Sequence, residues 1–135
     1  MTILDAVEEN LSRAAVIRRI KAGLERRSGK RWSVTGGTGT AYGWLTVDAL
    51  PGRRTWAHRR KPGALDSPGN YEEYDTGQKG GHSSPEERAE LAKLLGLDGV
   101  HFQGLNIAAG SDYRREYIDR AEGREPRKIA TPYWD

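Results

Sequence analysis

Hydrophobic residues recur at offsets of three and four between residues 13 and 27, which is the spacing of one helix face. Ser12 stands where an N-cap is expected, and Gly29 offers a left-handed stop after the last helical residue. Most charged residues of this segment lie away from the apolar stripe, so we expect an amphipathic helix with a basic outer face. The stripe consists of Val16, Ile17, Ile20 and Leu24.

Two later segments also have helical patterns. Ser84 can cap a helix over residues 85–95, the proline that follows suits its first turn, and Gly96 ends it. A shorter helix is expected between residues 111 and 122, with Gly123 as its stop and a cap at Ser111 or Asp112. The N-terminal segment has the same spacing at Leu4, Val7 and Leu11.

Alternation of apolar and polar residues predicts two strands that pair as an antiparallel hairpin over residues 31–49. One side of this hairpin should face the helices. A third strand is expected over residues 100–109, where Gly104 marks a change of phase that indicates a bulge. Leu45 and Val47 are the positions expected to face the helices, and Trp32 and Val34 share one side of the first strand.

The hairpin strands are separated by the glycine-rich run GGTG, with Gly36, Gly37 and Gly39. A phosphate-binding loop needs GxxxxGK[ST] opening a helix, or GxGxxG after a strand, and neither spacing occurs here. The glycines therefore predict a turn. A close approach of their N–H groups to a backbone phosphate is the alternative.

Residues 51–83 show no sustained periodicity and are rich in glycine and proline. A structureless stretch of this length is unusual inside a compact domain, so it predicts a functional loop or a mobile insert. The length of 135 residues suits one domain. We therefore expect a single α+β domain over residues 1–135, in which a small antiparallel sheet of about three strands packs against N-terminal and C-terminal helices.

Basic residues are concentrated in one part of the chain. The net charge is only +3, yet residues 13–61 hold thirteen Lys and Arg against two acidic residues. Such a concentration attracts polyanions through counterion release; a solvated surface neutralised by the acidic C-terminal half is the alternative. The predicted nucleic-acid-binding cations are Arg18, Arg19, Arg26, Arg27, Lys30, Arg31, Arg53, Arg54, Arg59, Arg60 and Lys61.

Three aromatic residues, Tyr42, Trp44 and Trp56, lie among these cations in the sequence. Aromatic side chains beside arginine suit base stacking, which contributes about 1–3 kcal/mol per base. We include all three in the predicted nucleic-acid-binding set. Burial of Tyr42 and Trp44 beneath the 51–83 segment is the alternative, because large aromatic side chains usually find cover.

Few residues offer catalytic chemistry. His58, His82 and His101 are far apart in the sequence and lack the spacing of metal ligands, and the chain has no cysteine. We therefore assign no catalytic residue, no metal and no cofactor. Acidic and tyrosine side chains on the predicted C-terminal helix are able to transfer protons, which leaves an enzyme as a third hypothesis. These residues are Asp112, Tyr113, Glu116 and Tyr117.

The segment AAVIRRIKAGLERRSGKRWSVTGGTGTAYGWLTVDA resembles the opening of an uncharacterised family of bacterial, plasmid and phage genomes. Its first part is similar to a large polyvalent protein-associated domain. The segment SDYRREYIDRAEGREP and the terminal PYWD resemble the C-terminal block of the same family. The resemblance implies a mobile genetic element, whose accessory proteins handle nucleic acid or counter host defences. It transfers no catalytic residue.

These observations predict a non-enzymatic, cytoplasmic accessory protein of a mobile element that binds DNA or RNA. No apolar run approaches the roughly 20 residues that span a bilayer, so no membrane partner is expected. A phage or plasmid anti-defence or regulatory protein that binds another protein is the alternative. The aromatic tail over residues 132–135 is expected to pack onto the domain; an exposed anchor for a protein partner is the other possibility.

Overall fold

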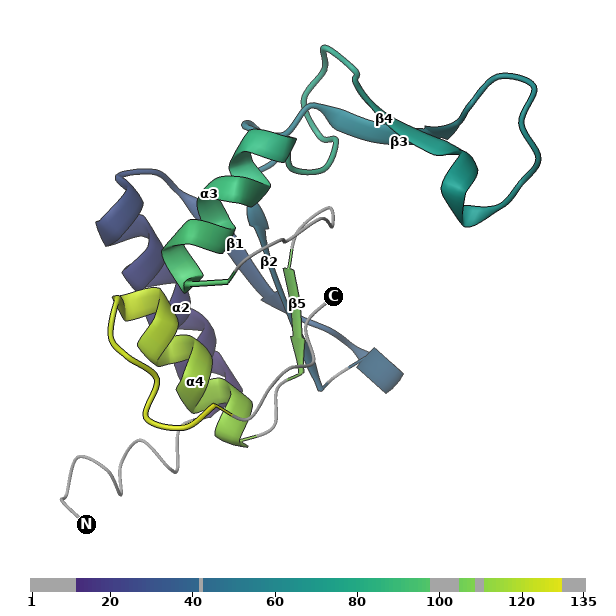
Figure 1. Ribbon diagram of the computed structural model, residues 1–135. Coiled ribbons are helices and arrows are strands. Elements are labelled where there is room, and N and C mark those ends of the chain that lie inside the picture. The colour runs from purple at the N-terminus through teal and green to yellow at the C-terminus, as the bar shows by residue number, and fades with distance from the viewer. Residues whose placement is uncertain (1–11, 42, 98–104, 109–110, 130–135) are drawn as a thin grey trace, which may run out of the picture.

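The computed structural model describes residues 12–41, 43–97, 105–108 and 111–129. Within these residues three α-helices cover one side of a three-stranded sheet, and a two-stranded sheet projects from this body (Figure 1). The predicted α+β class is therefore confirmed. In chain order the elements are α2 (Arg13–Ser28), β1 (Trp32–Gly36), the 3-10 turn η1 (Gly39–Ala41), β2 (Trp44–Ala49), β3 (Trp56–Arg60), the 3-10 turn η2 (Pro68–Asn70), β4 (Tyr71–Asp75), α3 (Pro85–Leu95), β5 (Leu105–Ala108) and α4 (Ser111–Glu122).

Local capping sets the bounds of helices α2 and α3, as the sequence predicts. In α2 the Ser12 hydroxyl accepts a hydrogen bond from the backbone N–H of Ala15, and Gly29 ends the helix with φ 71°. In α3 the Ser84 and Glu87 side chains each accept a hydrogen bond from the other's backbone N–H, which is a capping box. Each of these contacts satisfies a backbone group that has no partner within the helix.

The main sheet has the strand order β1-β2-β5, and both pairs are antiparallel. Val34 lies opposite Val47, and Leu45 lies opposite Ile107, so apolar side chains of all three strands share the face toward the helices. This arrangement confirms the predicted hairpin. The backbone N–H of Gly37 donates to the carbonyl of Trp44 at 2.9 Å, so the glycine-rich run turns the chain.

Helices α2 and α4 approach each other closely at Gly23. An ideal Cβ placed on Gly23 would lie 2.8 Å from the carbonyl oxygen of Ala121 and 2.9 Å from its carbonyl carbon. Real Cβ atoms do not approach backbone atoms so closely. The absence of a side chain at Gly23 therefore sets the separation of the two helices.

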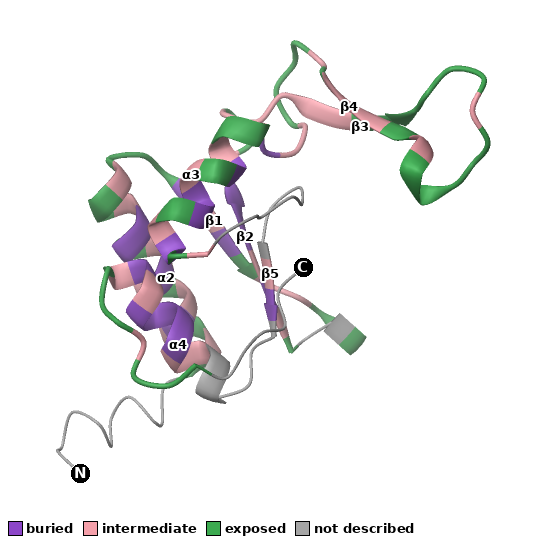
Figure 2. Cartoon of the chain, viewed as in Figure 1, coloured by how far each residue is buried: buried purple, intermediate pink, exposed green. Residues whose placement is uncertain are grey.

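The 51–83 segment, predicted as a loop or insert, contains strands β3 and β4, so the prediction that it lacks secondary structure is wrong. The two strands form the projecting arm, which we define as residues 56–75 (Figure 1). None of the residues of β3 and β4 is buried, whereas buried residues concentrate between the helices and the main sheet (Figure 2). The arm is therefore held by cross-strand pairing and by contacts at its base.

Several predictions fall on residues outside those that the structure describes. They are the N-terminal helix containing Leu4, Val7 and Leu11, the placement of Tyr42, the first part of the third strand at 100–104, and the aromatic tail at 132–135. These stay predictions. The described part of the third strand, β5, pairs with β2.

Candidate functional site

Complementary charges run along the two strands of the arm. Arg59 lies opposite Glu72 in the register, and the Arg59 Nε is 2.9 Å from a Glu72 carboxylate oxygen. The Arg59 guanidinium also lies over the ring of Tyr74, 4.5 Å from its centroid. Cross-strand pairs of this kind stabilise a sheet by about 0.2–1 kcal/mol each. The arm therefore holds its register without a hydrophobic core.

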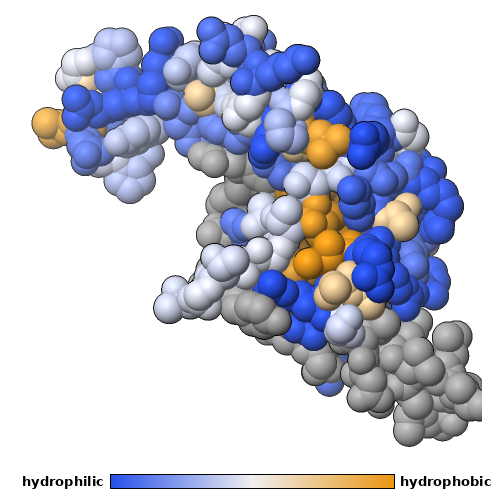
Figure 3. All heavy atoms as spheres, turned by 180° about the vertical axis from the view of Figure 1, so that it is seen from behind, coloured by the Kyte–Doolittle hydropathy of each residue, from blue (hydrophilic) through white to orange (hydrophobic). Residues whose placement is uncertain are grey.

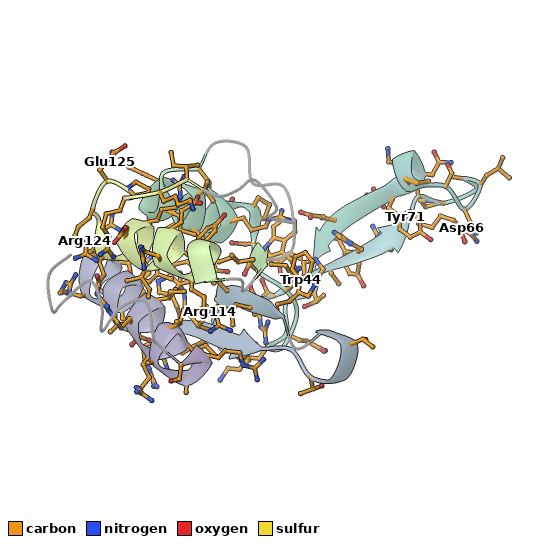
Figure 4. The ribbon with its side chains drawn as sticks, turned by 90° about the horizontal axis from the view of Figure 1, so that it is seen from below. Trp44, Asp66, Tyr71, Arg114, Arg124 and Glu125 are labelled. Carbon is orange, nitrogen blue, oxygen red and sulfur yellow. The ribbon has the colours of Figure 1, made fainter. Side chains whose placement is uncertain are left out.

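The far end of the arm exposes apolar and basic side chains together. Leu65 is 82% exposed, and hydrophobic atoms stand out against a hydrophilic surface at the end of the arm (Figure 3). Arg60 and Lys61 are exposed, and neither side chain forms a hydrogen bond or an ion pair with any of the described residues. Tyr71 points toward Asp66, to whose carboxylate its hydroxyl donates at 2.6 Å, well away from Trp44 in the body (Figure 4).

At its base the arm meets the body through a cluster of charged and imidazole groups, which we call the arm-base cluster: His58, Glu73, His82 and Arg88. His58 Nε2 lies 3.0 Å from a carboxylate oxygen of Glu73, and the rings of His58 and His82 are 4.6 Å apart between centroids. Both carboxylate oxygens of Glu73 accept hydrogen bonds from Arg88, a residue of α3 that is only 5% exposed. The two histidines, distant in the sequence, are therefore neighbours.

The surroundings in the arm-base cluster lower the pKa values of two of its members, Glu73 and His82. Hydrogen bonds from Arg88 lower the pKa of Glu73 from 4.5 to about 2, with further contributions from His58. Burial lowers the pKa of His82, and the nearby positive charges of His58, Arg88 and Arg54 act in the same direction against the opposing effect of Glu73. Near neutral pH the cluster therefore holds an ionised carboxylate beside a neutral His82.

The low pKa of Glu73 predicts a dependence of stability on pH. Because the pKa falls on folding, the carboxylate stabilises the folded state above its unfolded pKa of about 4.5, and this contribution is lost as pH falls toward 2. A shift of this size corresponds to about 3 kcal/mol, which solvent screening at this partly exposed carboxyl reduces to about 1–2 kcal/mol. Urea denaturation of the wild type and Glu73→Gln between pH 2 and 6 would measure it. Parallel pH profiles for the two proteins would contradict the assignment.

A second polar group lies beside this cluster. Asp48 of β2 is buried and accepts hydrogen bonds from the Ser83 hydroxyl and from Arg54, the latter at 2.5 Å. Burial raises the pKa of Asp48 although Arg54 acts to lower it. Trp56 and His82 exchange backbone hydrogen bonds of 3.2 and 2.7 Å. These contacts join both ends of the inserted segment to the edge of the body.

Acidic residues of α3 engage two of the predicted nucleic-acid-binding cations. Lys30 Nζ lies 2.8 Å from Glu90. Arg53 forms ion pairs of 2.9 Å with Glu87 and with Glu90, and its guanidinium covers the buried Trp32 ring at 4.5 Å. These cations join the loop after β2 and the end of α2 to α3, so their charge is balanced within the body.

Two predicted cations of α2 contact α4 and the end of α3. Arg19 forms an ion pair of 2.9 Å with Glu122. Arg27 donates hydrogen bonds to the carbonyls of Leu94, Arg120 and Ala121 at 2.8 to 2.9 Å. Cationic side chains commonly satisfy the last carbonyls of helices in this way. Arg27 therefore joins the C-terminal ends of two helices.

A pocket of about 430 Å³ lies beside these helix ends, and its lining includes Arg27, Lys93, Arg120 and Arg124. Arg120 donates to the carbonyl of Leu95, and Arg124 pairs with Asp119 and Glu122. Most of the positive charge around the pocket is therefore balanced by helix carbonyls and carboxylates. This arrangement gives little support to an anion site.

The remaining members of the predicted set are spread over the molecule. Arg18 and Arg26 are exposed on α2, and Arg31 is exposed beside β1. Trp44 is half-buried on the face of the main sheet that points away from the helices, and Trp56 is half-buried at the base of the arm. The structure does not gather the described members of the predicted set into one surface.

The described acidic and tyrosine residues of α4 that were candidates for proton transfer are packed inside the body. Glu116 and Tyr117 are fully buried, and Glu116 forms an ion pair of 2.9 Å with Arg120 one turn later. The side chains of Asp112 and Tyr113 are not among those described. Burial of Glu116 beside a cation supports packing rather than proton transfer.

Sequence reasoning missed the arm-base cluster, because its members come from β3, β4, the loop before α3 and α3 itself. The one available signal was the run of basic residues in 58–61 followed by acidic residues in 72–75, which suits an antiparallel pair. His58, Glu73 and His82 are also the described residues that bring possible metal-binding atoms together, all within 4.8 Å of one another.

Comparisons with known protein families, with curated proteins and with solved structures find no match to this chain. The resemblance to a family of mobile elements stays a prediction, because none of these comparisons tests it. Among the described residues, no helix combines the length and the apolar character needed to cross a membrane.

Proposed function

We propose that this protein binds nucleic acid and that the far end of the arm provides the contact. The observation that carries this proposal is the exposure of Arg60, Lys61 and Leu65 at the end of a two-stranded ribbon that projects from the body. Two-stranded β-ribbons fit into DNA grooves, and apolar side chains at such contacts insert between bases. Residues 59–71 carry a net charge of +2, which suits this contact.

The proposal replaces the broad basic surface expected from the sequence with a smaller one. Arg19, Arg27, Lys30, Arg53 and Arg54 all have partners within the body. Arg18 and Arg26 on the outer face of α2 are a separate group of exposed cations that would add nonspecific attraction. The resemblance to proteins of mobile elements and the absence of cysteine support a cytoplasmic accessory role.

Charge reversal at the end of the arm tests this function. We expect the double variant Arg60→Glu/Lys61→Glu to bind labelled duplex DNA, single-stranded DNA or duplex RNA at least tenfold more weakly at 50 mM NaCl. If both side chains contact phosphates, the slope of log K against log [NaCl] should fall by about 1.4–1.8. Fluorescence anisotropy between 50 and 300 mM NaCl would measure both quantities.

A matched control separates local contact from overall charge. Lys79→Glu/Lys93→Glu changes the net charge by the same amount at two exposed residues away from the arm end. It should keep most of the wild-type affinity and salt dependence. Equal losses in the two double variants, or no binding by the wild type at 50 mM NaCl, would reject the arm as a nucleic-acid contact.

A protein partner is the second candidate, and the exposure of Leu65 favours it. The whole arm carries a net charge of −1, so its attraction for a polyanion is confined to its end. A protein contact would depend on Leu65 and persist at high salt. Loss of a captured partner in Leu65→Ser, with retention in Arg60→Glu/Lys61→Glu, would favour this alternative.

A further inference from the structure

We propose that His58, Glu73 and His82 bind a divalent transition metal ion, Zn²⁺ in the first instance, at the base of the arm. Each residue offers one ligand atom, and the three atoms lie within 4.8 Å of one another. Two imidazoles and one carboxylate form a common set of protein ligands for Zn²⁺. The three ligands come from β3, β4 and the loop before α3, so the site is created by folding.

The distances within the cluster suit this ion. Zn–N and Zn–O bonds of about 2.0–2.2 Å at tetrahedral angles place neighbouring ligand atoms about 3.3 Å apart. His58 Nε2 and the Glu73 oxygen are already 3.0 Å apart. A zinc ion would take the place of the proton between these two atoms, and His82 offers a third ligand atom within 4.8 Å of both.

His82 supplies an independent indication of a ligand. Its Nε2 atom is buried and has no hydrogen-bond partner among the described residues. A buried polar atom without a partner costs free energy, which a bound metal would relieve. The neighbouring backbone groups of His82 are paired with Trp56, so the backbone of this residue is held in place beside the cluster.

Arg88 would act as a positioning residue for this site. Its two hydrogen bonds hold the Glu73 carboxylate in a fixed orientation, as residues behind metal ligands commonly do. Its positive charge opposes a second cation, so we expect weaker binding than at a site without it. Three protein ligands leave a coordination position for water, and the bound ion would fix the angle between arm and body.

The test uses the full chain after treatment with EDTA. We expect Zn²⁺ to bind with a stoichiometry of one by isothermal titration calorimetry at pH 7.5, and Co²⁺ to give the intense visible absorption of a tetrahedral site. His58→Gln and His82→Gln should each weaken binding at least about tenfold. Glu72→Gln, which removes the adjacent carboxylate outside the cluster, should bind as the wild type does.

A measurement on the wild type guards against variants that fail to fold. Addition of Zn²⁺ should shift the imidazole NMR signals of both His58 and His82. The proposal is overturned if the wild type binds no Zn²⁺, if Zn²⁺ shifts other histidine signals instead, or if folded His82→Gln binds with unchanged affinity. None of these outcomes depends on whether the arm end binds nucleic acid.

Discussion

Replacing Gly23 with alanine is expected to lower the free energy of unfolding by about 2 kcal/mol, because the new methyl group would overpack the contact between α2 and α4. In an exposed helix the same change would stabilise the protein by about 1 kcal/mol. Here the added Cβ would lie 2.8 Å from the carbonyl oxygen of Ala121, which belongs to the backbone and cannot rotate away. The two helices would have to separate, and the packing beneath them would loosen.

Urea denaturation monitored by circular dichroism would measure this change. The neighbouring Ala22 is exposed, so Ala22→Gly reports helix propensity alone and should cost about 1 kcal/mol. The sign of the Gly23 effect is therefore decisive. An increase in stability for Gly23→Ala would show that α2 and α4 are not in close contact at this point.

Near neutral pH, Glu73→Gln is expected to lower the free energy of unfolding by about 1–2 kcal/mol. The substitution preserves the shape of the side chain but removes the charge that balances Arg88, whose side chain is 6% exposed. Removing one partner of a buried ion pair costs about 3–5 kcal/mol, and the partial exposure of Glu73 places our expectation below that range. Denaturation in the presence of EDTA excludes any contribution from bound metal.

The adjacent carboxylate provides the matched control. Glu72 pairs with Arg59 on an exposed part of the arm, where such ion pairs contribute about 0–1 kcal/mol. Glu72→Gln should therefore change stability by no more than about 0.5 kcal/mol. Similar losses for the two substitutions would indicate that stability responds to the overall charge of the arm. They would also show that the burial of Arg88 does not require the charge of Glu73.

Elements whose signals are local could be predicted from the sequence. Helix α2 is bounded by Ser12 and Gly29, and α3 by Ser84 and Gly96, and all four act within a few residues of themselves. The β1–β2 hairpin was also predictable, because one face alternates apolar residues around a glycine-rich turn. In each case the periodicity and the boundary signals agree.

The arm and its base could not be predicted in the same way. Strands β3 and β4 bury no side chain, so they lack the apolar alternation by which strands are recognised. Their pairing depends on contacts such as Arg59 with Glu72, which require the register to be known. Arg27 gave no local signal either, since its carbonyl partners lie in α3 and α4.

Because the inserted segment is closed at its base, its length can change with little effect on the body. Trp56 and His82 exchange two backbone hydrogen bonds, so the chain leaves and re-enters the body at one place. Gly81 permits this closure, since a Cβ there would lie 2.4 Å from the Trp56 carbonyl oxygen. Because the entropy of loop closure rises by only about 0.6 kcal/mol for each doubling of length, the reach of the insertion can be altered at little cost to its scaffold. The length of the arm and the residues that it exposes can therefore change within this one segment. The sequence of the body is constrained separately, by its own packing.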